Sequence, residues 1–206
     1  MFDEMLNYVT EYLNSNGGQI SQLPFRVRSD HIKRVFMWTN QLIDGVDAPI
    51  NRDALLTAAA FHDIGYANLS ENEPHAENSA KIFLQYAATK DYSEQDKQFI
   101  AYLIQNHSNK NMLHDDDAPL ELILLIEADL LDETGALSIV WDCMMEGGET
   151  IQSFTKTYEH IKNYSGKILR ENPLVTKKGK LYWEQKQTLT AEFIKQFAFD
   201  IGIIAN

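Results

Sequence analysis

The chain has very little cysteine, no long apolar run and few basic residues for its size. Its one cysteine, Cys143, has no disulfide partner within the chain, which is typical of a reducing compartment, and we expect it to be a small buried apolar residue. The longest apolar run, residues 122–126, is far shorter than the ~18–20 residues of a transmembrane helix. The first residues, MFDE, carry no basic segment of the kind found in a signal peptide, so the sequence predicts a cytoplasmic protein.

Basic residues are outnumbered: 18 Lys and Arg face 30 Asp and Glu, which gives a net charge of −12 and a pI near 4.8. Such a surface repels nucleic acid polymers and anionic membranes, so we exclude both as partners. A small phosphorylated substrate stays compatible with this charge, because a bound metal ion can reverse the field locally. With 206 residues, 44% of them hydrophobic, the chain is long enough for one large domain.

Apolar residues recur at helical spacing through most of the sequence. The pattern predicts helices from residue 2 to the glycines at 17–18, from Asp30 as N-cap to Gly45, from Asn51 to Gly65, and over 76–89, 93–107, 120–132, 135–146, 150–171 and 180–203. We therefore expect an all-α, single-domain helical bundle. Residues 1–148 form its main domain, and residues 149–206, rich in Lys, Tyr and Gln, add extra C-terminal helices packed on it.

The pair His62-Asp63 is the most informative local feature. It closes the apolar helical segment Ala58-Ala59-Ala60-Phe61 and directly precedes Ile64-Gly65. A buried carboxylate and a buried imidazole are costly without partners, and a divalent cation would satisfy both.

Here the sequence resembles the metal-dependent HD-domain phosphohydrolases. The signature of that family is one His, then an adjacent His-Asp, then a distant Asp, and His31, His62-Asp63 and Asp129 match it in order and approximate spacing. The flanking residues agree as well, with Ile64-Gly65 after the pair and Ala128 before Asp129. The match covers a core motif region of residues 28–136.

The resemblance implies that His31, His62, Asp63 and Asp129 bind a divalent metal ion. Two imidazoles and two carboxylates suit Mn, Fe, Co, Ni, Zn or Mg. A bound metal makes hydroxide available from water near neutral pH, and Asp63 acts in catalysis with that metal-bound water by orienting it.

His75 and His107 lie between the core motifs. Dinuclear members of the superfamily carry two extra histidines at this point and bind a second metal ion, so a possible second metal site is one interpretation. In mononuclear relatives, polar residues at such positions contact the substrate phosphate instead. We favour one metal, with His75 and His107 as substrate-binding residues.

Phosphate also needs cations. Arg34 follows His31 by three residues and so lies on the same helix face, and Lys110 follows His107 in a loop from which it can reach across the site. We expect both to bind the substrate.

These observations together predict a metal-dependent phosphohydrolase acting on a small phosphorylated substrate, a nucleotide or a related phosphate ester. One alternative is a dinuclear iron oxygenase of the HD type, which would use all six ligands. Another is a non-enzymatic HD module that binds a nucleotide as a signal. Apolar residues of the last helix, among them Phe193, Phe197, Phe199 and Ile203, could form a homodimer interface or pack internally.

Overall fold

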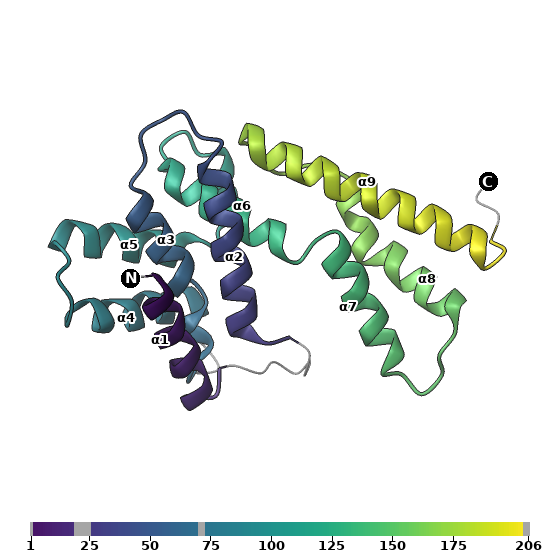
Figure 1. The fold of residues 1–206 in the computed structure, drawn as a ribbon, viewed down its shortest axis with the longest axis horizontal. Helices are drawn as coiled ribbons and strands as arrows, with labels where there is room; N and C mark the ends of the chain where they lie inside the picture. The colour runs from purple at the N-terminus through teal and green to yellow at the C-terminus, as the bar shows by residue number, and fades with distance from the viewer. Residues whose placement is uncertain (1, 19–25, 70–72, 204–206) are drawn as a thin grey trace. The chain divides into compact units, whose positions relative to one another are not determined.

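The structure is a computed structural model that describes residues 2–18, 26–69 and 73–203 (Figure 1). Its described part consists of α-helices and short 3-10 helices without a β-strand, which confirms the all-α fold. The α-helices are α1 (Phe2–Ser15), α2 (Arg28–Ile43), α3 (Arg52–Phe61), α4 (His75–Ala87), α5 (Glu94–Asn106), α6 (Leu120–Asp132), α7 (Ala136–Gly147), α8 (Phe154–Asn163) and α9 (Lys177–Asp200). The 3-10 helices are η1 (Ile64–Tyr66), η2 (Lys110–His114) and η3 (Ser165–Leu169).

The chain divides into two compact units, Met1–Asp129 and Leu130–Asn206. The expected domains, residues 1–148 and 149–206, and the packing of the second on the first stay predictions.

Helix α3 is the central helix of the first unit. Its residues from Ala54 to Phe61 are all buried, and it packs against α1, α2 and α5. Alanines at four of these positions leave room for the neighbouring helices to approach closely. The helix is capped by the Asn51 side chain, which accepts a hydrogen bond from the Ala54 amide at 3.1 Å, as its sequence predicts. The residues that follow α3 therefore emerge inside the unit.

Several helix boundaries differ from those expected. Helix α2 begins at Arg28 with Val27 as N-cap, so the prediction that Asp30 caps it is wrong by most of a turn. Helix α3 ends at Phe61 and not at Gly65. The helix expected over 150–171 is two shorter ones, because the poor helix formers Asn163 and Gly166 flank a break at Tyr164.

Helix α9 also begins earlier than expected. The side chain of Thr176 accepts a hydrogen bond from the Gly179 amide at 3.0 Å, which starts the helix at Lys177. The helix continues to Asp200, short of the expected end at residue 203.

In the second unit, α7 and α8 are joined by a buried polar cluster. The His160 ring lies between two carboxylates, with Nδ1 2.8 Å from Glu146 Oε1 and Nε2 3.3 Å from Asp142 Oδ1. The backbone amide of Ser165 donates to the other oxygen of Asp142 at 3.1 Å. Cys143, next to Asp142, is exposed, so the expectation that it is buried is wrong.

The exposed residues of α9 include two of the four proposed for a dimer interface. Phe193 is 37% and Phe199 is 79% exposed. The homodimer stays a prediction.

Within the described residues, none of the helices is both long and apolar enough to cross a membrane.

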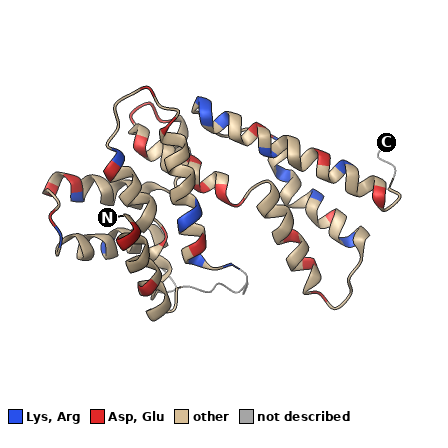
Figure 2. Cartoon of the chain, viewed as in Figure 1, with Lys and Arg blue, Asp and Glu red and all other residues tan. Residues whose placement is uncertain are grey.

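The negative charge is unevenly divided along the chain. Residues 1–129 hold 9 Lys and Arg against 20 Asp and Glu, a net charge of −11, whereas residues 130–206 hold 9 against 10, a net charge of −1. Figure 2 colours the Asp and Glu positions of the ribbon red, and they are spread over the helices of the first unit. An acidic unit attracts cations and repels phosphates, so any phosphate site within it needs positive charge of its own.

Candidate metal centre

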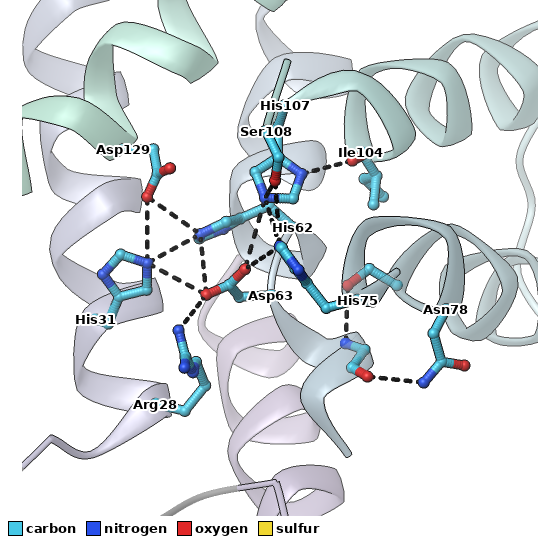
Figure 3. Close-up of polar contacts among 12 residues, drawn as sticks. Arg28, His31, His62, Asp63, His75, Asn78, Ile104, His107, Ser108 and Asp129 are labelled. Carbon is cyan, nitrogen blue, oxygen red and sulfur yellow. Dashed lines mark hydrogen bonds and ion pairs between the residues drawn. The ribbon is translucent and has the colours of Figure 1, made fainter. Parts of the chain in front are cut away.

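Five segments of the first unit bring histidines and carboxylates to one place (Figure 3). Helix α2 contributes His31 and α6 contributes Asp129, while His62 and Asp63 follow the last turn of α3. His75 is the first residue of α4, and His107 directly follows α5. These six are the residues that the sequence singled out as metal ligands or second-metal candidates.

The first group of donor atoms is centred on His31. Its Nε2 lies 3.2 Å from His62 Nε2, 3.4 Å from Asp63 Oδ2 and 3.3 Å from Asp129 Oδ1. His62 Nε2 is 3.9 Å from the same Asp63 oxygen and 4.0 Å from the same Asp129 oxygen. Atoms that each lie about 2.1 Å from a shared ion are roughly 3.0–3.4 Å apart, so a divalent metal fits this group with little rearrangement.

The second group uses the other oxygen of Asp63. Oδ1 lies 3.3 Å from His75 Nε2 and 3.5 Å from His107 Nε2, and these two nitrogens are 3.4 Å apart. The Ser108 hydroxyl is 3.2 Å and 3.1 Å from the same two nitrogens. The donor atoms of Asp63, His75 and His107 are thus as closely grouped as those of His31, His62 and Asp63.

Backbone carbonyls fix the orientation of two of the rings. His62 Nδ1 is 2.8 Å from the carbonyl oxygen of Ala59, and His107 Nδ1 is 2.6 Å from that of Ile104. A carbonyl can only accept, so each Nδ1 carries the proton and donates it. Nε2 of each neutral ring then keeps its lone pair for a metal ion, the usual arrangement for histidine ligands.

The charges in the cluster favour metal binding. Burial alone would raise the pKa of Asp63, but the neighbouring histidines and the Arg28 guanidinium outweigh burial and hold that pKa well below its usual value. Burial lowers the pKa of His62 to about 4, so its ring is neutral at neutral pH. Burial likewise lowers the pKa of His75. For His107, burial lowers the pKa but the hydrogen bond and charge of Asp63 raise it more, because the carboxylate favours positive charge on this ring.

A close approach between η1 and α4 brings His75 to the cluster. A Cβ atom on Gly65 would lie 2.1 Å from the carbonyl oxygen of His75 and 2.4 Å from the Ser79 amide nitrogen, so only glycine fits. The Gly65 amide donates to Ser79 Oγ at 2.8 Å, and Asn78 Nδ2 donates to the Gly65 carbonyl at 2.7 Å. This contact allows a histidine only twelve residues after Asp63 to reach its carboxylate.

Three residues of the site escaped the sequence analysis. Arg28 Nη1 donates to Asp63 Oδ2 at 2.6 Å, Tyr66 stacks on the His75 ring, and Ser108 contacts both histidines of the second group. Arg28 precedes His31 by three residues, the same spacing by which Arg34 follows it. Starting the helix at Asp30 hid this relation, because it left Arg28 outside the helix.

Two of the predicted substrate-binding residues lie outside the two groups. Arg34 is half-buried on α2, and Lys110 is exposed at the first residue of η2. Neither belongs to the two groups of metal-binding atoms, and their contact with a substrate stays a prediction.

The cluster reaches solvent through two of its members. The side chains of Asp129 and His75 are 29% and 24% exposed, whereas those of His31, His62, Asp63 and His107 are at most 5% exposed. A substrate would therefore arrive past Asp129 and His75, with the buried residues behind them.

The protein-family model of the HD domain matches residues 28–134 of this chain, and these residues contain the whole cluster. No curated protein matches the chain.

Solved structures with the same fold cover nearly the whole chain. An HD-superfamily hydrolase from Bacillus thuringiensis is 20% identical over 98% of this chain and 97% of its own, with a TM-score of 0.72. Bacillus subtilis YpgQ in complex with ADP is 17% identical over 97% and 94%, with a TM-score of 0.67. A predicted HD superfamily hydrolase from an uncultured Thermotogales bacterium is 17% identical over 96% and 91%, with a TM-score of 0.68.

Proposed function

The chain belongs to the HD domain family, and from this we propose that it is a metal-dependent phosphohydrolase acting on a small phosphorylated substrate. One observation carries the proposal: imidazole and carboxylate donors from α2, the residues directly after α3, and α6 converge within the distances that one divalent ion requires. Such a set of imidazole and carboxylate donors suits a divalent transition metal ion.

In this proposal His31, His62, Asp63 and Asp129 hold the metal ion, which when bound activates a water molecule and polarises the phosphorus–oxygen bond. Asp63 is the catalytic carboxylate. Since its pKa is held below the usual value, it is a weak base and orients the attacking water without keeping its proton. The Ala59 carbonyl keeps His62 in the tautomer that leaves Nε2 available.

We further propose that the second group holds a second ion, the arrangement that the sequence left as the alternative to one metal. The supporting observation is the division of one carboxylate: Oδ2 of Asp63 faces His31, while Oδ1 faces His75 and His107. Two metal ions that share a carboxylate stabilise both the attacking and the leaving oxygen in phosphoryl transfer. His75 and Ser108, at the opening, would then lie next to the substrate.

A nucleotide is the substrate class that we propose. Support comes from Bacillus subtilis YpgQ, a protein with the same fold whose structure is a complex with ADP. Arg34 and Lys110 are the proposed phosphate-binding cations.

Phosphate release by the protein loaded with Mn²⁺ tests the proposal, with nucleoside mono-, di- and triphosphates and simple phosphate esters as substrates. We expect release that is abolished by chelation and by His62→Ala. Iron-dependent oxygen consumption without phosphate release would instead support the oxygenase alternative, since it too uses two metals. Tight nucleotide binding with no turnover of any compound would support the non-enzymatic alternative.

A further inference from the structure

Arg28 is a buried cation with a specific setting. Its side chain is 8% exposed, its Nη1 donates to Asp63 Oδ2 at 2.6 Å, and its guanidinium lies 3.7 Å from the centre of the Tyr66 ring. A planar guanidinium can combine a directional hydrogen bond with stacking on an aromatic face, which lysine cannot do.

Tyr66 connects Arg28 to the second group, because it contacts both Arg28 and His75. Its ring stacks on that of His75 at 4.5 Å between centroids and 18° between planes. His75 Nε2 in turn lies 3.3 Å from Asp63 Oδ1. Arg28, Asp63, His75 and Tyr66 therefore form a closed ring of contacts built from α2, the end of α3, α4 and η1.

This ring restrains two rotations. The hydrogen bond from Arg28 fixes the plane of the Asp63 carboxylate, so that one oxygen faces His31 and the other faces His75 and His107. The stacked Tyr66 ring likewise fixes the plane of the His75 imidazole, so that its Nε2 stays directed at Oδ1.

We infer that Arg28 is a positioning residue that, together with Tyr66, sets the affinity of the second group for a metal ion. The inference rests on the proposed function, in that it requires the two groups to bind metals, and it goes beyond it by assigning a role to two residues that are not ligands. Partners that orient metal ligands typically contribute about 10–100-fold to metal affinity.

A purely electrostatic role of Arg28 makes the opposite prediction. A positive charge beside Asp63 repels metal ions, so losing that charge would tighten binding at both groups. Arg28→Lys separates the two roles, because it keeps the charge but removes the planar, stacking group.

The test is titration of the full, metal-free chain with Mn²⁺ by calorimetry, together with electron paramagnetic resonance to detect coupling between two bound ions. For the wild-type chain we expect two ions per chain. Tyr66→Leu should weaken binding of the second ion by at least about tenfold and change binding of the first by less than about threefold. Arg28→Lys and Arg28→Met should also weaken binding of the second ion by at least about tenfold. Tyr66→Phe keeps the stacked ring and should bind both ions as the wild type does.

Circular dichroism of each metal-free variant checks that it is folded. If Arg28→Met does not fold because it leaves Asp63 unpaired, Arg28→Lys and Tyr66→Leu still decide the question. Wild-type affinities in Arg28→Lys, tighter binding in Arg28→Met, or a single ion in the wild-type chain would each overturn the inference. The proposed function fails separately, by the absence of any bound metal or of phosphate release from the wild-type chain.

Discussion

Replacing Gly65 by alanine should separate the second metal group from the first. The added Cβ would lie 2.1 Å from the His75 carbonyl oxygen and 2.4 Å from the Ser79 amide nitrogen, both of them backbone atoms that no side-chain rotation can move away. Since ordinary contacts begin near 3.4 Å, the start of α4 must retreat by roughly 1 Å.

That shift has a calculable cost. Overpacking of this kind destabilises by about 1–3 kcal/mol. The hydrogen bonds from the Gly65 amide to Ser79 and from Asn78 to the Gly65 carbonyl would be stretched, at about 1 kcal/mol each. We therefore expect Gly65→Ala to lower the stability of the first unit by about 3–5 kcal/mol. His75 moves with α4, whereas His31 and His62 do not. The affinity of the second group for Mn²⁺ should therefore fall more than that of the first.

Native-state hydrogen exchange of the α3 and α4 amides measures this stability, and calorimetry with Mn²⁺ measures the binding. The matched control is Gly147→Ala, since a Cβ on Gly147 at the end of α7 meets nothing within 4 Å. Gly147→Ala should leave hydrogen exchange in α3 and α4 unchanged, and it should stabilise α7 by up to about 0.5–1 kcal/mol. Wild-type exchange and wild-type metal binding in Gly65→Ala would refute the argument that this glycine is needed for the approach of α4.

Three further predictions concern single residues. Asp63→Asn removes the carboxylate that both groups share, so Mn²⁺ affinity at both sites and phosphate release should fall by at least about a hundredfold; a change confined to one site would contradict the sharing. The pKa of His62 is about 4 in the folded chain against 6.5 ordinarily, so as the pH falls the unfolded chain takes up this proton first. The metal-free protein should therefore lose up to about 3 kcal/mol of stability between about pH 6.5 and about pH 4, seen as a falling Tm, and His62→Gln should flatten that fall. His160→Leu removes the ring between Asp142 and Glu146, which keep Ser165 and Lys156 as their other partners, and should destabilise the second unit by about 1–3 kcal/mol. Hydrogen exchange should rise in α7 and α8 and not in α2 or α3.

The sequence alone determined the class of fold and predicted the candidate metal ligands. Helical periodicity predicts an all-α chain because each amphipathic helix must bury one face, and the structure confirms it. His62 and Asp63 are recognisable because polar, ionisable residues directly follow an apolar helix, where they need partners. Helix caps such as Asn51 of α3 can also be predicted from the sequence, because the capping side chain bonds to an amide within the same turn.

Helix boundaries were harder to predict from the sequence where several neighbouring residues could act as the cap. Asp30 is a good capping residue by type, but α2 begins at Arg28, and the helical relation between Arg28 and His31 follows from that start. The break after Asn163 lies between two poor helix formers, and a hydrogen bond from the Ser165 amide to Asp142 in α7 also stabilises it.

Only the tertiary structure decided how the candidate ligands are shared. Nothing in the spacing of His75 shows that it meets Asp63, because the contact depends on Gly65 admitting the backbone of α4. The two oxygens of Asp63 are identical in the sequence and become different only when Arg28 binds one of them and His75 approaches the other. These differences arise from contacts between segments that are distant in the chain, so the local sequence pattern cannot predict them.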